Sequence, residues 1–440
     1  MFLQNIWLLF KKLSQEEIMK KGLKSLAVLG LSVLGLVGCG GDNSKKLVVG
    51  LVSVGDTSET YSKAHIDGIN EAAKKLGAQV VLKTSVPESS AVIDSANEIV
   101  EQGASVVFTN SYGHQDYAYQ FAKDNKDVTV VAATGDYAAI SGLTNFKNAF
   151  TNIYEARYVS GIVGGMKLKE LVDSNKLDAT KNKDANGNWK IGYVGAFNYA
   201  EVVSGYTAFY LGVKAGFGAD NVAMEVQYTD SWYDHDGENA TAKALIAHGN
   251  VIIGQHADST GAPEAIEDAH KKGEEVYSVG YNVDMLSAAP TAALTSATNN
   301  WGKYYEYAIE AAIKGETIAT DWAKGYNDDA VAITKLGPSV AAGTAEAVAK
   351  AEADIKAGKL HVFDTSKFTV AGEHITTNKV DFSYMDWSTN PPSVVHQGAT
   401  KETIKTDTYG TYVEESVERS APYFSLRIDG ITEVAKAAKN

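Results

Sequence analysis

The chain has 440 residues, of which 45% are hydrophobic and 21% charged, and its formal net charge is −14. This length exceeds one ordinary domain, so we expect two or three lobes with large cores. The acidic balance argues against nucleic-acid binding, because neutralising phosphates requires clustered Lys and Arg residues. The single cysteine excludes an intramolecular disulfide and any metal cluster built from cysteines.

The N-terminal part has the pattern of a secretion signal followed by a tether. A basic stretch precedes an apolar run at 26–36, which is too short for a membrane span of about 20 residues. We therefore predict a signal peptide over 1–38, with synthesis starting at Met19 because two acidic residues just before it do not fit such a signal. The segment Leu36-Val37-Gly38-Cys39 resembles a bacterial lipobox, which implies a diacylglyceryl anchor on the Cys39 sulfur and a lipidated tether over 39–46. A buried core cysteine is the alternative.

After the tether, buried strands alternate with amphipathic helices. The first series of strands is predicted at 47–54, 80–82, 105–108 and 128–132. The alternation of strands and helices is interrupted near 148–153, where a glycine-rich helix begins. The small residues of this helix would allow a close contact with another helix or a hinge crossing. A second series then follows, with strands predicted at 190–194, 222–228, 251–253, 276–279 and 292–296.

This alternation predicts an α/β fold of two Rossmann-like lobes, each with a parallel sheet covered by helices, joined by a hinge. Lobe 1 is assigned residues 47–150 and about 281–320. Lobe 2 is assigned residues 151–280 and about 321–440, including a C-terminal extension to which the sequence gives no function.

Polar and aromatic segments follow the predicted strands of both series. In open α/β sheets, small ligands bind in the crevice outside the carboxyl ends of the strands. We therefore predict one small-molecule site, to which these segments contribute Tyr61, Asn110, Tyr112, Trp232, His256, Asp258, Asp284 and Trp301.

Several of these residues have both a functional interpretation and a structural alternative. Tyr61, Trp232 and Trp301 are suited to stacking on a planar ring, and ordinary helix or lobe packing is the alternative. Asp284 could accept ligand N–H or hydroxyl groups, or simply be exposed. Asn110 could bond the edge of a ring, or cap the next helix.

The group with the most catalytic pattern is His256, Asp258 and Ser259, at the end of a predicted strand. Nothing in the sequence places the serine within reach of the histidine. Phosphate-loop, zinc-protease and nucleophile-elbow motifs are absent. We therefore predict no catalytic residues, no cofactor and no metal, and assign His256 and Asp258 to ligand hydrogen bonding.

A set of segments carries a family resemblance. They are the lipobox, Gly192-Tyr193-Val194-Gly195, Tyr228 to Asp234, Gln255 to Ser259, Gly280 to Met285, and Leu294-Thr295-Ser296 leading to Asn300-Trp301. Together they resemble the basic membrane protein family of substrate-binding lipoproteins, over roughly residues 47–363. The resemblance implies a type I periplasmic-binding-protein fold, with Tyr61 and Trp232 at aromatic stacking positions and Asp284 at a carboxylate that meets ribose or a ring nitrogen.

Two departures from the family pattern bear on the ligand. An Asp that often opens the first loop falls on Ser58, and the Lys expected after Leu294-Thr295-Ser296 falls on Asn299. Both losses weaken the assignment of a nucleoside in particular.

The function implied by the resemblance is a receptor, not an enzyme. It implies a lipid-anchored protein on the extracytoplasmic face of a bacterial cell membrane, which captures a purine nucleoside or purine base between its lobes. The implied partners are the permease and ATPase subunits of an ABC importer, with no nucleic acid. Another ligand such as riboflavin or a sugar, or a role as a ligand sensor, is the alternative, and an extracytoplasmic hydrolase is the rival from a different class.

Overall fold

The alternating strands and helices form two large sheets within one unit, residues 46–440. The computed structural model describes residues 46–386 and 389–434, so the predicted signal peptide, Cys39 and nearly all of the tether lie outside the described residues. Among the described helices, none combines the length and apolar composition needed to cross a membrane.

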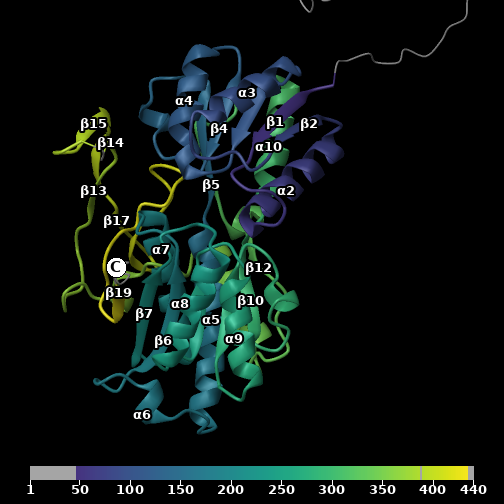
Figure 1. The fold of residues 1–440 in the computed structure, drawn as a ribbon. Coiled ribbons are helices and arrows are strands. Elements are labelled where there is room, and N and C mark those ends of the chain that lie inside the picture. The colour runs from purple at the N-terminus through teal and green to yellow at the C-terminus, as the bar shows by residue number, and fades with distance from the viewer. Residues whose placement is uncertain (1–45, 387–388, 435–440) are drawn as a thin grey trace, which may run out of the picture. The chain divides into compact units, whose positions relative to one another are not determined.

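The first sheet is parallel throughout and has the order β2–β1–β3–β4–β5–β11. Its strands are β1 (Val48–Val52), β2 (Gln79–Lys83), β3 (Val106–Thr109), β4 (Thr129–Ala133), β5 (Phe146–Thr151) and β11 (Asp321–Lys324). Its helices are α2 (Thr60–Leu76), α3 (Ala91–Glu101), α4 (Gln115–Asp124) and α10 (Trp301–Lys314). In β3, Val106 and Phe108 face the α2 and α10 side while Val107 faces α3 and α4, as strand periodicity requires (Figure 1).

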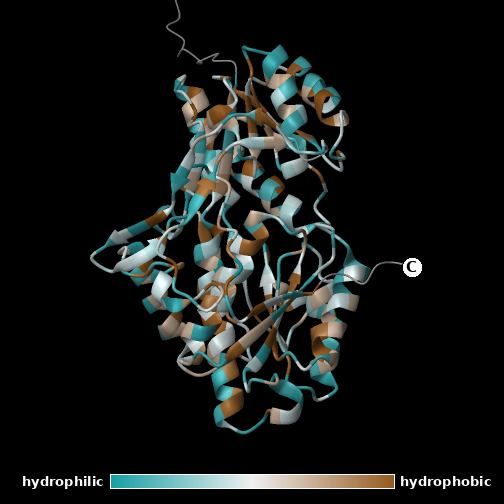
Figure 2. Ribbon diagram, turned by 90° about the vertical axis from the view of Figure 1, so that its left-hand side faces the viewer, coloured by the Kyte–Doolittle hydropathy of each residue, from teal (hydrophilic) through white to brown (hydrophobic). Residues whose placement is uncertain are grey.

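The second sheet has the order β7–β6–β8–β9–β10, which is the order of β2–β1–β3–β4–β5 repeated, with an extra strand at each edge. Its strands are β6 (Trp189–Gly195), β7 (Val222–Tyr228), β8 (Ile252–Gln255), β9 (Tyr277–Tyr281), β10 (Ala293–Asn299), β12 (Val331–Ile333) and β19 (Ile431–Val434). Its helices are α5 (Ile153–Asp173), α7 (Ala200–Phe217), α8 (His235–Ala247) and α9 (Gly261–Lys271). Figure 2 shows both hydrophobic and hydrophilic residues along the helices, whereas α5 and α7 are buried on all sides over much of their length, as expected for helices in the interior.

The remaining elements are one further helix of 13 residues, α11 (Thr344–Lys356), and a set of shorter elements. The shorter ones are α6 (Ala179–Asn182), the 3-10 turns η1 (Tyr112–His114), η2 (Ala138–Ile140), η3 (Met285–Ser287), η4 (Tyr326–Asp328) and η5 (Thr365–Lys367), and the strands β13 (Lys379–Asp381), β14 (Tyr384–Asp386), β15 (Ser393–His396), β16 (Thr400–Glu402), β17 (Ile404–Asp407) and β18 (Gly410–Val413). We call residues 365–434 the extension.

Sheet membership corrects one expected lobe boundary. The first lobe was expected to resume at about residue 281, but β10 pairs with β9 within the second sheet, so the chain returns only after Asn299. It then forms α10, which lies beside α2, and β11, which pairs with β5 of the first sheet (Figure 1).

Three crossing segments connect the two sheets, at 151–153, 299–301 and 324–331. They are hydrogen-bonded to one another. The side chains of Thr151 and Asn299 form a hydrogen bond, Asn152 N donates to Lys324 O at 2.8 Å, and Asn300 N donates to Ala330 O at 2.9 Å. The crossing segments therefore form one connected region.

Helices α5 and α7 approach closely because glycines lie where they meet. A Cβ atom on Gly161 would lie 2.3 Å from Phe209 O, and one on Gly165 would lie 2.1 Å from Val213 O. From α7, a Cβ on Gly212 would lie 2.0 Å from Tyr158 O. The close helix contact, one of the two possibilities expected from the glycines of α5, is therefore present.

We expect Gly161→Ala to destabilise the protein by about 1–3 kcal/mol, because the added methyl group overlaps a backbone carbonyl that cannot move alone. Gly302→Ala on α10 is the matched control, since its Cβ would lie 3.3 Å from Asn300 Oδ1 and no closer than 3.8 Å to the backbone of Gly68. Chemical denaturation measures both. Equal stability of the two variants would contradict this account of the contact.

Glu155 links two of the crossing segments. Its carboxylate accepts the N–H of Tyr326 at 2.8 Å, and burial raises its pKa to about 7 from an ordinary value of 4.5. The folded state thus favours the protonated carboxyl group. The resulting stabilisation is complete below the pKa that Glu155 has in the unfolded chain. It is lost as the pH rises through the pKa of Glu155 in the folded protein.

Between pH 5 and 8 we therefore expect the wild-type free energy of unfolding to fall by about 3 kcal/mol more than that of Glu155→Gln. Denaturant titrations across this pH range measure the difference. Glu346→Gln, which changes an exposed carboxylate on α11, should follow the wild type. Parallel pH profiles for wild type and Glu155→Gln would rule out the proposed role of Glu155.

Candidate ligand-binding site

A cavity of about 760 Å³ lies where the carboxyl ends of the two sheets meet. From the first sheet, residues on β5 and after β1, β3 and β4 line it, including Glu59, Tyr61, Asn110, Tyr112, Asp136 and Phe150. From the second sheet, residues after β6, β7 and β8 and at the end of β9 line it, including Tyr199, Glu201, Trp232, His256, Asp258 and Tyr281. This is the crevice expected for a ligand of paired α/β lobes.

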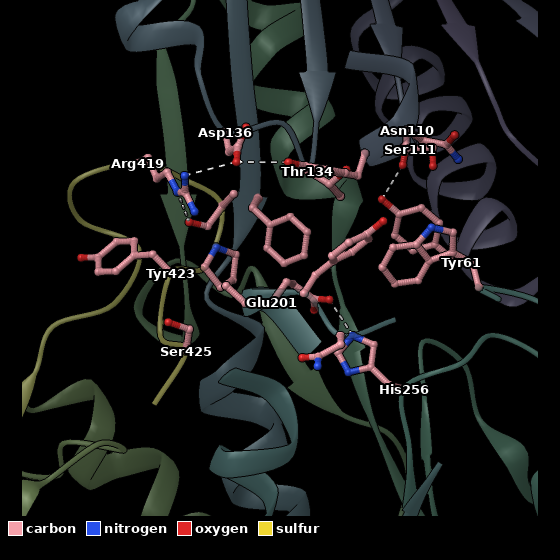
Figure 3. A pocket seen from close by; sticks show the side chains of 18 of the residues that line it. Tyr61, Asn110, Ser111, Thr134, Asp136, Glu201, His256, Arg419, Tyr423 and Ser425 are labelled. Atoms are coloured by element: carbon pink, nitrogen blue, oxygen red, sulfur yellow. Dashed lines mark hydrogen bonds and ion pairs between the residues drawn. The ribbon is translucent and has the colours of Figure 1, made fainter. Parts of the chain in front are cut away.

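A chain of hydrogen bonds organises the side of the cavity formed by the second sheet. Arg157 donates to the hydroxyl group of Tyr193 at 2.6 Å, and that oxygen lies 3.3 Å from Nδ1 of His256. Nε2 of His256 lies 2.6 Å from a carboxylate oxygen of Glu201 (Figure 3). This pattern assigns the histidine proton to Nε2, so that Nδ1 accepts from Tyr193 and Nε2 donates to Glu201.

The charges in this chain follow from burial. Burial and the nearby charge of Arg157 lower the pKa of His256, which is therefore neutral at pH 7. Burial alone would raise the pKa of Glu201, but His256 and Arg157 lower it below its ordinary value. Glu201 thus remains an ionised acceptor. One of its oxygens binds His256, and the other, Oε1, is buried with no hydrogen-bond partner among the described residues.

Asp258 of the second lobe lies near a second carboxylate, Glu59, which belongs to the first lobe. Burial raises the pKa of Asp258 well above its ordinary value, and the nearby carboxylate of Glu59 raises it further. Oδ1 of Asp258 accepts a hydrogen bond from Asn282 at 2.6 Å. The carbonyl oxygen of Asp258 accepts from the hydroxyl group of Thr60 at 2.8 Å, which connects the two lobes.

Aromatic rings form much of the remaining wall. Trp232 contacts Phe197, with ring centroids 4.9 Å apart, and Tyr199, with centroids 6.0 Å apart. Tyr199 also contacts Tyr112 of the first lobe at 5.6 Å. The cavity therefore combines flat apolar surfaces with a few fixed polar groups, which is the usual composition of a small-molecule site.

Six of the eight predicted ligand residues line this cavity: Tyr61, Asn110, Tyr112, Trp232, His256 and Asp258. The side chain of Asn110 is already occupied, because its oxygen accepts from Val54 N at 2.9 Å and its nitrogen donates to Ser53 at 3.0 Å. Asn110 therefore supports the wall through the segment after β1, and it does not cap the next helix, which was its structural alternative.

The other two predicted residues lie outside the lining. Asp284 is exposed and begins η3, where its Oδ1 accepts from Leu286 N at 2.8 Å. Trp301 is 1% exposed and stacks on His65, with centroids 4.0 Å apart, behind the ring of Tyr61. We do not include Asp284 and Trp301 in the site.

Sequence reasoning missed Glu201 and the extension. Glu201 lies in the first turn of the helix that follows β6, so the strand-end argument applied to the loop after β6 would have pointed to it. The extension contributes Asp381, Ser383, Tyr384, Arg419, Tyr423 and Ser425 to the lining, and no pattern in its sequence indicates this.

The group His256, Asp258 and Ser259 is not arranged for nucleophilic catalysis. The hydroxyl oxygen of Ser259 accepts from Gly261 N at 3.1 Å at the start of α9, and His256 pairs with Glu201 instead. This hydrogen bond belongs to a local turn just before α9, so the hydroxyl group of Ser259 has a structural role.

Comparison with known proteins identifies the family. Residues 46–364 match the family described as ABC transporter substrate-binding protein, PnrA-like. A purine-binding protein of Brucella abortus is 29% identical over 343 residues, which is 75% of this chain and 88% of that protein. A Haloferax volcanii protein provisionally named as an ABC transporter glucose-binding protein is 29% identical over 291 residues, 65% of this chain and 67% of that protein.

Solved structures agree on the fold. An ABC transporter solute-binding protein from Aeropyrum pernix superposes with a TM-score of 0.59 at 15% identity, covering 74% of this chain and 94% of that one. This likeness confirms the predicted fold of two α/β lobes with parallel sheets. Members of the matched family are extracytoplasmic substrate-binding proteins of ABC transporters, not enzymes, and they bind a small ligand and interact with transporter components. The chain belongs to the PnrA-like family of ABC transporter substrate-binding proteins, the basic membrane proteins that its sequence resembles.

Proposed function

We propose that this protein is a lipid-anchored receptor that captures a purine base or purine nucleoside for an ABC importer. The observation that carries the proposal is Oε1 of Glu201, a buried carboxylate oxygen that has no partner among the described residues and lies at an aromatic cavity. Leaving such an acceptor unpaired is costly, so a bound ligand is expected to supply a donor.

A purine satisfies both features of the site. Its ring N–H and exocyclic amino groups donate hydrogen bonds to a carboxylate, and its flat faces stack on aromatic side chains such as Trp232. The purine-binding relative supports this ligand class. A sugar is the second candidate, favoured by the name of the Haloferax volcanii relative, and its hydroxyl groups could also donate to Glu201.

The test is calorimetric titration with adenine, guanine, hypoxanthine, their nucleosides, D-glucose and riboflavin. We expect purine binding that weakens about ten- to hundredfold in Glu201→Gln, because a hydrogen bond to a charged group contributes about 1.5–3 kcal/mol. Trp232→Ala should weaken it by a similar factor through lost stacking. Glu71→Gln, which changes an exposed carboxylate on α2, should bind like the wild type.

Binding of glucose but no purine would overturn the purine assignment and leave the receptor assignment in place. Purine binding that Glu201→Gln leaves unchanged would show that the unpaired oxygen is not the recognition group.

The lipid anchor rests on the sequence Leu36-Val37-Gly38-Cys39, which has the form of a lipobox. In a bacterial host that processes lipoproteins, we expect the wild-type chain to fractionate with membranes and to take up labelled fatty acid. Cys39→Ser should lose the label, because the sulfur that carries the lipid is gone. A Cys39→Ser protein that retains the label would disprove anchoring at this residue.

A further inference from the structure

The extension lies beyond residues 46–364, which match the family, yet it forms one wall of the cavity. Figure 3 shows Arg419, Tyr423 and Ser425 at one end of the cavity, apart from Tyr61 and His256 at the other. The cavity is therefore longer than the part that the two lobes enclose alone.

The extension is held against both sheets, so its position in the cavity is fixed. Ser420 donates from its N–H and its hydroxyl group to Asp321 of β11, both at 2.8 Å. Tyr384 donates to the carboxylate of Asp116 on α4 at 2.9 Å. Toward the second sheet, Phe424 stacks on Phe363 with centroids 4.2 Å apart, and β19 pairs with β7.

Within the extension itself, a buried carboxylate fixes the stretch that reaches the cavity. Glu415 accepts the backbone N–H groups of Tyr423 at 3.0 Å and Phe424 at 2.8 Å. Residues 415–424 therefore form a hydrogen-bonded loop that presents Arg419 and Tyr423 to the ligand space.

The polar groups at this end form a pair made from two parts of the chain. NH1 of Arg419 lies 3.2 Å from Oδ2 of Asp136, and their side chains are 17% and 12% exposed. Asp136 also accepts from Gln115 at 3.1 Å and from the hydroxyl group of Tyr112 at 3.4 Å. A guanidinium group has five N–H donors, so one ion pair and the contact of Nε with Ala421 O leave donors for a ligand.

A fixed donor beside a fixed acceptor is suited to hydroxyl groups, which both donate and accept. It is poorly suited to a phosphate group. The charge of Arg419 is already offset by Asp136, and the cavity lining also includes Glu201 and Asp381, whose pKa values are lowered by their partners, so that both are ionised. An anionic substituent would therefore be repelled more than attracted.

We infer that Arg419 of the extension and Asp136 of the first lobe form a second subsite, which contacts the hydroxyl groups of a neutral, hydroxylated substituent on the ligand ring. The inference rests on the proposed purine site and adds the residues that separate a nucleoside from its free base. In this protein, part of the specificity comes from a segment outside the region that matches the family.

The experiment compares Arg419→Gln with the wild-type full chain by calorimetric titration against guanosine, inosine and adenosine, their free bases, and adenosine monophosphate. We expect Arg419→Gln to weaken nucleoside binding about tenfold while changing free-base affinity less than twofold. Retained base binding also shows that the variant is folded. Lys405→Gln, which alters an extension lysine that is not part of the cavity lining, should leave both affinities unchanged. The wild type should bind the monophosphate at least tenfold more weakly than adenosine.

Equal losses for base and nucleoside, or no loss for either, would overturn the second subsite while leaving the proposed purine function intact. If the wild type binds no purine at all, the proposed function fails, and the same comparison with D-glucose decides the subsite. If Arg419→Gln weakens glucose binding and Lys405→Gln does not, the result would support the contact of Arg419 and Asp136 with ligand hydroxyl groups. Any other result with glucose would reject it.

Discussion

The ligand cavity depends on one buried positive charge, the guanidinium group of Arg157. It is 2% exposed, and a buried charge is costly unless its surroundings compensate. Arg157 donates to Tyr193 and to the carbonyl oxygen of Gln255, and it lies 3.8 Å from the ring centroid of Tyr281. These three residues belong to β6, β8 and β9. The guanidinium group of Arg157 therefore connects the carboxyl ends of these three strands at the cavity. Its charge also favours the ionised form of Glu201.

The two lobes already touch at the cavity in this structure. Thr60 donates to Asp258 O, and the rings of Tyr112 and Tyr199 lie 5.6 Å apart. A ligand bound between these contacts would favour the same arrangement over one with the lobes apart, because only here can it reach both walls. The hydrogen-bonded crossing segments restrict where the backbone can bend during such a change, since hinges are usually a few residues between packed bodies.

Most strands of the two sheets could be predicted because they are short apolar runs between turn signals, whereas β5, β11, β12 and β19 were not predicted. The cavity followed from the strand-end argument. The sheet to which β10 belongs could not be predicted, because its sequence would look the same in either sheet. Glu201 was missed because its importance comes from His256, 55 residues away in the sequence. The approach of Arg419 to Asp136 spans 283 residues through irregular chain, where no periodicity reveals which groups meet.

Strand β19 has a consequence for the behaviour of the whole protein in a crowded solution. It pairs in parallel with β7, from Ile431 opposite Met224 to Val434 opposite Gln227, and so covers one edge of the second sheet. An uncovered edge offers unpaired N–H and C=O groups to a strand of another molecule, which is a common start of aggregation. The extension thus moves the edge of the sheet from the seven-residue β7 to the four-residue β19, which offers a shorter stretch for intermolecular pairing. Shortening the extension would expose β7 as well as open the cavity.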